Sequence, residues 1–284
     1  MHGIIALVDG SVYTRSVCDH AAWAAGRLGA GVELLHVLAR PTLSGAAPDF
    51  SAYLDPQTRD ALLADLAAHD EQTAKLAQRR ARAILDDAKA QLAEAGVADC
   101  TARLRQGDLL EAVQDIEPTA NLLVIGKRGE AADFARLHLG SNLERLVRSS
   151  QKPILVVARA FKPIHRVLVA FDGGASVMKA VAHMATSTLF AGLEVHLLAV
   201  GTPNAEADRR LEEATATLRR AGLVATKQIL PGQPDEVIAR TVRDESFGLL
   251  VMGAYGHSRI RTLIIGSTTT EMIRSCLIPV MLFR

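Results

Sequence analysis

The chain has 284 residues, a formal net charge of +1, and 49% hydrophobic against 22% charged residues. This length and composition predict two globular domains with apolar cores. The small net charge and the 4% aromatic content argue against a nucleic-acid partner, which requires clustered cations and stacking rings. Three cysteines without CxxC spacing indicate reduced thiols. No apolar run approaches the ~18 residues of a membrane span and no signal peptide is recognisable, so we expect a cytoplasmic protein with no membrane contact.

The first half alternates strand-like and helical runs. Strands are predicted at residues 3–8, 32–37, 102–105, 122–125 and 153–157, and helices at 11–28, 56–95, 109–116 and from 141 onward. Continuous apolar runs of this kind suit strands that are buried on both faces. Ser11 is the expected N-cap of the first helix, and Asp55-Pro56 the expected start of the second. The polar stretch 69–73 predicts a break, which would make 56–95 a pair of solvated amphipathic helices.

The second half repeats this order. Its strands are predicted at residues 167–170, 194–200, 226–229, 249–252 and 279–283, with a shorter helix at about 205–221 before the third strand. The sequence Leu-Leu-Val-Ile-Gly at 122–126 returns as Leu-Leu-Val-Met-Gly at 249–253, which indicates a duplicated domain. The predicted fold class is therefore α/β, with two similar doubly wound parallel-sheet (Rossmann-like) domains in tandem, at 1–158 and 165–284.

Two loops of each half are candidates for ligand binding, because ligands of doubly wound sheets bind at the carboxyl ends of the strands. An aspartate follows the first strand of each half, Asp9 and Asp172. A glycine motif follows the fourth strand, as Gly126-x2-Gly129-x10-Gly140-Ser141 and Gly253-x2-Gly256-x9-Gly266-Ser267. Glycines allow close backbone approach, and the helix that starts at each serine favours an anion such as a phosphate. The structural alternative is that the glycines only form turns and that the serines and aspartates only cap helices.

With these motifs on both halves, the whole chain resembles a tandem universal stress protein. Members of that family that bind nucleotides carry Gly-x2-Gly-x9-Gly-Ser/Thr after the fourth strand and an aspartate at the end of the first, which the second half matches. The resemblance implies an adenine nucleotide alpha hydrolase-like fold, a role in stress resistance, and ATP, ADP or AMP as ligand, with Mg accompanying the nucleotide. It also implies that the last strands, 153–157 and 279–283, pair within the chain; a further homodimer and an unidentified protein partner stay open.

The resemblance carries over to named residues in both halves. In the second half, the aspartate would lie near the adenosine, a backbone after the second strand would meet the adenine edge, and the remaining residues would hold ribose and phosphates. These residues are Asp172, Val200, Gly253, Gly256, Gly266, Ser267 and Thr268. The corresponding residues of the first half are Asp9, Val37, Gly126, Gly129, Gly140, Ser141 and Asn142. One extra residue in the spacer of the first half predicts weaker nucleotide binding there, or none.

Other residues near these motifs have less specific interpretations. Lys127 and Arg128 would meet phosphates or remain surface charges, His257 is more typical of a solvated loop, and Tyr255 would be a packing residue or a lid. Cys276 is expected to be buried and inert.

Two other function classes remain beside a nucleotide-binding regulator. One is an adapter that binds no nucleotide. The other is an enzyme, for which the chain offers neither a P-loop nor a GxSxG motif, leaving at most slow ATP hydrolysis.

Overall fold

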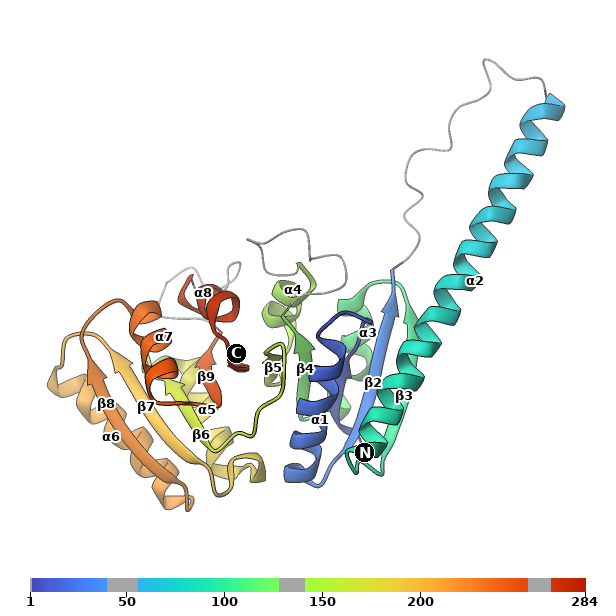
Figure 1. The fold of residues 1–284 in the computed structure, drawn as a ribbon. Coiled ribbons are helices and arrows are strands. Elements are labelled where there is room, and N and C mark those ends of the chain that lie inside the picture. Colours follow the sequence, from blue (N-terminus) through green and yellow to red (C-terminus); the bar gives the residue numbers. More distant parts are fainter. Residues whose placement is uncertain (1, 40–55, 128–140, 255–266) are drawn as a thin grey trace.

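The computed structural model describes residues 2–39, 56–127, 141–254 and 267–284. Its strands form a single ten-stranded sheet in the order β3-β2-β1-β4-β5-β10-β9-β6-β7-β8 (Figure 1). The first five strands in the chain occupy one side of this sheet and the last five occupy the other. Each half has its first strand between its second and fourth, so the strand order reverses beside the first strand. The α/β fold class with tandem doubly wound halves is confirmed.

The elements of the first half follow the predicted order. The strands are β1 (His2–Leu7), β2 (Gly31–Leu38), β3 (Cys100–Gln106), β4 (Leu122–Gly126) and β5 (Ile154–Val157). The helices are α1 (Thr14–Leu28), α2 (Pro56–Glu94), α3 (Leu109–Ile116) and α4 (Ser141–Ser149), with a short 3-10 helix, η2 (Glu117–Thr119), after α3. The strands β1, β2, β4 and β5 read as near-continuous apolar runs because helices cover both faces of the sheet.

The second half repeats this order with shorter connections. The strands are β6 (Arg166–Ala170), β7 (Glu194–Val200), β8 (Val224–Leu230), β9 (Leu249–Gly253) and β10 (Val280–Phe283). The helices are α5 (Ala175–Thr186), α6 (Ala205–Arg220), α7 (Pro234–Asp244) and α8 (Ser267–Ser275), with the 3-10 helix η4 (Thr188–Phe190) after α5. Strands β3 and β8, which lie at the two edges of the sheet, extend beyond their predicted limits because their alternating, half-exposed ends lack a clear apolar run.

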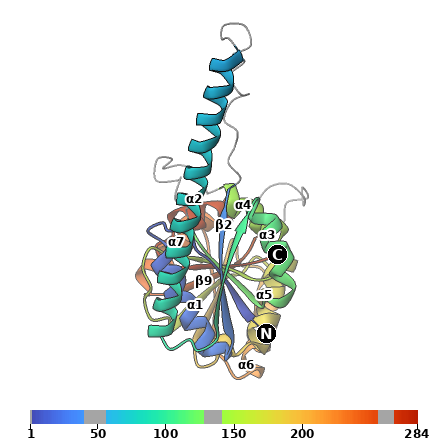
Figure 2. The ribbon, with the colours of Figure 1, turned by 90° about the vertical axis from the view of Figure 1, so that its right-hand side faces the viewer.

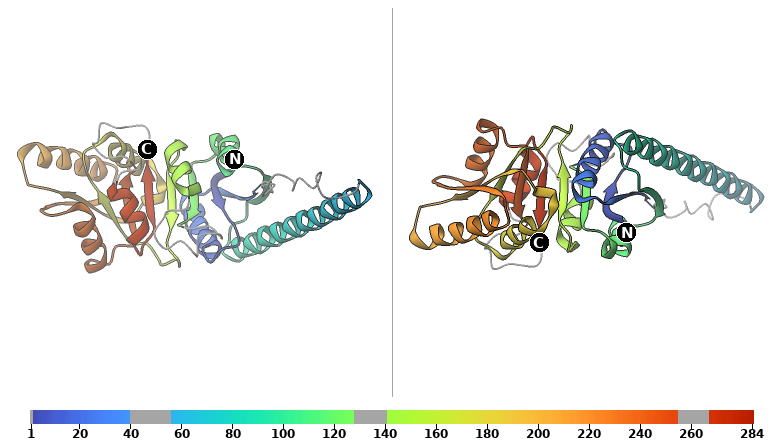
Figure 3. Two further views of the ribbon diagram at one scale, coloured as in Figure 1. Left: turned by 90° about the horizontal axis from the view of Figure 1, so that it is seen from above. Right: turned by 90° about the horizontal axis from the view of Figure 1, so that it is seen from below.

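Two apolar layers cover the two faces of the sheet. Helices α1, α2, α5 and α6 contribute to one layer, and α3, α4, α7 and α8 contribute to the other. Figure 3 shows the helices on both sides of the strands. Both layers run across the two halves without interruption, so burial of apolar surface stabilises them as one body.

The predicted pairing of the last strands is confirmed. Strand β10 runs antiparallel to β5, with Val280 opposite Val156 and Met281 opposite Leu155. The other strand pairs are parallel. The four residues of each of these two strands are buried. Joining them covers two apolar edges that would otherwise be open to aggregation.

The predicted break in the second helix is wrong. Helix α2 is continuous over 39 residues, which at about 1.5 Å per residue is ~58 Å long. Residues 69–73 are polar but contain no glycine or proline, so none of them interrupts the backbone hydrogen bonding of the helix. The outer part of α2 extends well beyond the rest of the molecule (Figures 1 and 2).

The predicted N-cap at Ser11 is also wrong. Helix α1 begins at Thr14, and its N-cap position is Tyr13, whose side chain makes no capping bond. The Ser11 hydroxyl accepts a hydrogen bond from the Tyr13 N–H at 3.2 Å, so Ser11 stabilises the turn before the helix. The start of α2 at Pro56 agrees with the Asp55-Pro56 signal.

Candidate functional site

In each half the strand register brings the predicted site residues to one edge of the sheet. Ala6 of β1 lies between Leu34 of β2 and Val124 of β4, so the carboxyl ends of these strands, with Asp9, Val37 and Gly126, lie together. In the second half, Ala170 lies between Leu198 and Met252, and the ends of its strands carry Asp172, Val200 and Gly253. The structure therefore gathers the described candidates of each half at the position where doubly wound sheets bind ligands.

Asp9 shapes the loop after β1. Its Oδ1 accepts a hydrogen bond from the Ser11 N–H at 3.0 Å, and the Thr14 hydroxyl lies 3.5 Å from the same atom. Gly10 between them has φ +76°, a conformation that other residues adopt at a cost. The aspartate thus forms a local turn and is not the cap of α1.

Asp172 makes the same turn after β6. Its Oδ1 accepts a hydrogen bond from the Gly174 N–H at 2.8 Å, and Gly173 has φ +70°. Helix α5 has its N-cap at Gly174, so Asp172 does not cap it. The side chain of Asp172 is exposed at the carboxyl end of the sheet.

The two Asp-Gly loops face different neighbours. A Cβ atom placed on Gly173 would lie 3.7 Å from the Arg210 guanidinium of α6. A Cβ atom on Gly10 would lie 2.6 Å from the Cδ1 atom of Ile84 in α2. A cation therefore borders the second loop, whereas an aliphatic side chain packs closely on the first. Neither neighbour was predicted, because each contact joins segments far apart in the sequence.

The start of α8 is fixed to the end of β9. The Thr269 hydroxyl donates a hydrogen bond to the Gly253 carbonyl at 3.1 Å, and Thr269 is buried. This bond places Ser267 and Thr268, on the first turn of α8, beside the end of the strand. The N–H groups of a first turn have no partner within the helix and carry a partial positive charge, which favours an anion.

A different contact holds α4 in the first half. Asp108, the N-cap of α3, accepts hydrogen bonds from the Arg145 guanidinium of α4 at 2.6 and 3.0 Å. The Arg145 guanidinium, with the backbone N–H groups of the α3 first turn, holds the pKa of the Asp108 carboxyl below its usual value. Ser141 and Asn142 begin α4, and Asn142 is exposed.

His36 also lies in this region, and the sequence did not predict its contact. It is buried directly before Val37, and its Nδ1 lies 2.7 Å from the Val8 carbonyl oxygen. Nδ1 carries the proton and donates it in a hydrogen bond to the Val8 carbonyl. This bond connects the end of β2 to the residue directly before Asp9. A single histidine within an apolar strand carries no motif that would have indicated this contact.

Neither interpretation of Lys127 is right. Its side chain is buried, and its ammonium group donates a hydrogen bond to the Cys276 carbonyl, directly after the last residue of α8. A cation at this position stabilises the carboxyl end of a helix. Lys127 therefore joins the two halves. Cys276 is buried as expected, and burial raises the pKa of its thiol, which disfavours the reactive thiolate.

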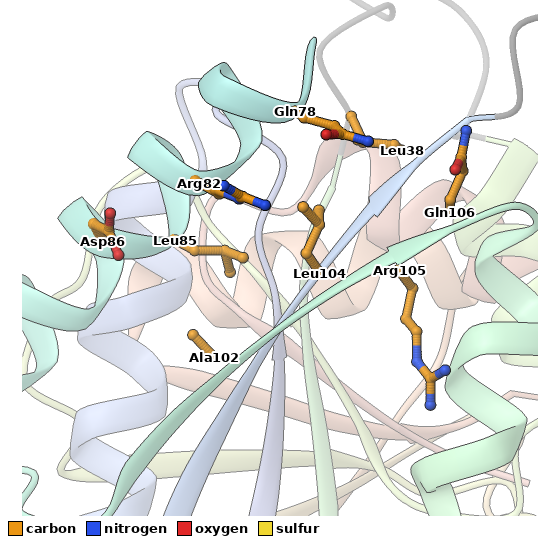
Figure 4. Close-up of a pocket in the computed structure, with 9 residues that line it drawn as sticks. All are labelled: Leu38, Gln78, Arg82, Leu85, Asp86, Ala102, Leu104, Arg105 and Gln106. Carbon is orange, nitrogen blue, oxygen red and sulfur yellow. The ribbon is translucent and has the colours of Figure 1, made fainter. Parts of the chain in front are cut away.

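A hollow of about 520 Å³ lies between α2 and the ends of β2 and β3, on the face of the sheet opposite to the one where Val37 packs. Its apolar lining includes Leu38, Leu85 and Leu104. Figure 4 shows Gln78 and Arg82 of α2 reaching over these side chains, whereas Arg105 points away from the centre.

Several predicted residues lie outside the described part of the chain: Gly129, Gly140, Gly256, Gly266, Arg128, Tyr255 and His257. Among the described residues, no group of three acidic, histidine or cysteine side chains is arranged to hold a metal ion. None of the described helices has the length and apolarity needed to cross a membrane.

Comparisons with known proteins agree with the fold. The model of the universal stress protein family matches residues 1–158 and again residues 163–284. The chain belongs to the universal stress protein family. A universal stress protein of Synechocystis, Slr1230, is 37% identical over 287 residues, which covers all of both chains. A Mycolicibacterium smegmatis universal stress protein is 23% identical and covers all of this chain and 97% of its own.

Solved structures of the family have the same fold. The structure of a universal stress protein from Archaeoglobus fulgidus superposes with a TM-score of 0.73 at 19% identity, covering 99% of this chain and 98% of that one. Membership in the family supports a role in the stress response.

Proposed function

We propose that the second half binds an adenine nucleotide and that this binding is the regulatory step of the protein. The observation that carries the proposal is the Thr269–Gly253 hydrogen bond, which sets the N-terminus of α8 beside the end of β9. The exposed Asp172 carboxylate lies at the end of a neighbouring strand of the same half. An anion-favouring helix start and an acceptor for hydroxyl groups suit the phosphates and the ribose of one ligand.

The proposed roles follow the family pattern. Asp172 contacts the ribose or adenosine, and the backbone of Val200 meets the adenine edge. The phosphates lie against the glycine loop and the first turn of α8, at Gly253, Gly256, Gly266, Ser267 and Thr268. Mg that accompanies the nucleotide would bind through its phosphates. We propose ATP, ADP or AMP as the ligand.

We propose that the two halves, with boundaries at 1–158 and 165–284, are unequal. The close contact of Ile84 with Gly10 and the extra spacer residue both distinguish the first site, where Asp9, Val37, Gly126, Gly129, Gly140, Ser141 and Asn142 fill the corresponding places. Calorimetric titration with ATP should therefore give one site per chain, or two sites of clearly different affinity. Two sites of indistinguishable affinity would contradict the inequality.

The main test replaces a glycine of the second loop. Gly266→Val would place a side chain where the backbone is proposed to approach the phosphates, and we expect at least tenfold weaker ATP binding in calorimetry. Gly140→Val is the matched variant in the first half and should have a smaller effect. Equal affinity of the wild type and Gly266→Val would exclude the proposed site. No detectable binding by the wild type would favour an adapter that needs no nucleotide.

The role of Asp172 is tested by two substitutions. Asp172→Asn keeps an oxygen that accepts from the Gly174 N–H, so the turn is retained. Asp172→Ala removes both the turn and any ligand contact. We expect both variants to bind ATP more weakly and only Asp172→Ala to lower thermal stability. If Asp172→Asn binds ATP like the wild type, the aspartate has only the structural role.

A further inference from the structure

The outer part of α2 exposes apolar side chains. Leu63, Leu66 and Leu76 are 43%, 41% and 61% exposed. In Figures 1 and 2 this part of the helix projects away from the sheet and from the other helices. Exposed leucines on a projecting helix are typical of a contact surface where they share a side of the helix with further apolar residues.

Several apolar or small side chains form one stripe along α2. Successive members lie one or two helical turns apart, so they share a side of the helix. We call them the outer stripe: Leu62, Leu66, Thr73, Ala77 and Ile84. At Ile84 the stripe reaches a hollow of about 670 Å³ between α2 and the start of α1, which Ala83 and the 52%-exposed Val12 also line. An apolar stripe that continues into a hollow can accommodate a second helix.

Charges are segregated along the same helix. The segment 60–71 contains four carboxylates and no lysine or arginine, namely Asp60, Asp65, Asp70 and Glu71. The segment 72–85 contains four cations and no carboxylate, namely Lys75, Arg79, Arg80 and Arg82. Segment 60–71 of α2 is thus acidic, and segment 72–85, which follows it, is basic. A helix of this kind is complementary to a copy of itself that runs in the opposite direction.

We propose that the outer part of α2 pairs antiparallel with α2 of a second copy of this chain. A two-fold axis between Gln72 and Thr73 would set Asp65 opposite Arg80 of the second copy and Leu62 opposite Ala83 of the second copy. The outer leucines of each copy then enter the hollow beside Ile84 of the other. The same surface serves both copies, as a two-fold interface requires, and the flanking charges fix the direction.

This pairing is independent of nucleotide binding in the second half, because neither the outer stripe nor the hollow beside Ile84 contains a ligand residue proposed for that half. It also differs from the β5–β10 pairing, which lies within one chain. An interface on α2 leaves that junction intact. The full chain is therefore expected to be a dimer whose association depends on α2 and does not require ATP.

Charge reversal with rescue tests the pairing in sedimentation velocity. Residues 60–85 carry four carboxylates and four Lys or Arg, so their net charge is 0 in the wild type. Asp65→Lys with Asp70→Lys changes it to +4, and Arg79→Glu with Arg80→Glu changes it to −4. Each variant alone should associate at least tenfold more weakly than the wild type, because like charges then face each other. An equimolar mixture of the two should recover the dimer. Asp115→Lys on α3 is the control for charge change alone and should associate like the wild type. The proposal would be overturned if the wild type remained monomeric at every concentration. It would also be overturned if neither charge reversal weakened the association of the dimer.

A cysteine near the proposed axis gives a second readout. Cys18 and Cys276 are buried, so Cys100→Ser removes the one native thiol that is partly exposed. In that background Thr73→Cys should form a disulfide-linked dimer under mild oxidation. Lys75→Cys is two residues away on the opposite side of α2 and should not. Equal cross-linking at both positions would indicate random collision and would count against a defined interface.

Discussion

At the scale of single residues, the burial of histidine side chains affects how the stability of the protein depends on pH. His20 of α1 is fully buried, its Nδ1 lies 2.7 Å from the Ser16 carbonyl oxygen, and its Nε2 has no partner among the described residues. Burial lowers the pKa of His20 below its usual value, and burial likewise lowers the pKa of His183 and of His196. The folded protein therefore holds these rings neutral at pH values where the unfolded chain binds protons.

This linkage predicts acid destabilisation. Because the folded pKa lies below the unfolded value of about 6.5, the free energy of unfolding falls as the pH drops below about 6.5, by at most ~1.4 kcal/mol per pH unit and histidine. His20→Leu should make this dependence shallower in urea unfolding between pH 7 and 5. His69→Leu changes a histidine that is 76% exposed and should leave the slope unchanged. Equal slopes for the wild type and His20→Leu would contradict the assignment.

The site also shows at this scale what a sequence can and cannot predict. Asp9, Asp172 and the described glycines Gly126 and Gly253 were predictable because each lies in a short motif directly after a strand. Arg210 was not, because it contacts the second loop from a helix that is distant in sequence. Lys127 lay beside a motif glycine and resembled a phosphate ligand. Its partner, the Cys276 carbonyl, is visible only once the two halves are joined.

At the scale of elements, local signals predicted most strands and helices, and tertiary contacts decided the rest. Helix α3 begins and ends as predicted, since Asp108 is a strong N-cap and accepts from the Leu110 and Glu111 N–H groups at 2.9 and 3.3 Å. The continuity of α2 was missed because a polar stretch was interpreted as a break, although polarity alone does not end a helix. Glycine or proline would have done so.

The N-cap of α3 leads to a prediction about how α4 is held. Asp108→Ala removes the cap and the acceptor for Arg145, and we expect the free energy of unfolding to fall by about 1–2 kcal/mol. Asp108→Asn retains the capping oxygen and should cost less, because an exposed ion pair contributes only ~0.2–1 kcal/mol. Asp115→Ala on the exposed face of the same helix is the control and should stay within ~0.5 kcal/mol of the wild type in urea unfolding. Equal losses for the alanine and asparagine variants would assign the whole effect to the ion pair.

At the scale of the whole molecule, cations of each half bind carbonyl groups of the other. Lys127 donates to the Cys276 carbonyl, and the Arg284 guanidinium donates to the Ser149 carbonyl at 3.2 Å. These two acceptors lie at the carboxyl ends of α8 and α4, where a positive charge is stabilising. Arg27 of α1 donates to the Leu189 carbonyl of η4 at 2.5 Å. Because of these contacts and the shared sheet, we expect the two halves to unfold as a single cooperative unit.

A charge placed in the β5–β10 strand pair tests whether the two halves unfold together. Val156 is fully buried opposite Val280, so Val156→Asp would desolvate a carboxylate within the pair, at a cost on the order of 4 kcal/mol. Because β5 and β10 cover each other, we expect both halves to unfold at lower temperature in calorimetry and the radius of gyration in solution scattering to increase. Leu277→Asp lies just before β10 at a side chain that is 90% exposed, and it should change neither quantity. Val156→Asp could instead lower the melting temperature of the first half alone and leave the melting temperature of the second half and the radius of gyration unchanged. That result would show that the two halves are stabilised independently and that the shared sheet does not couple them.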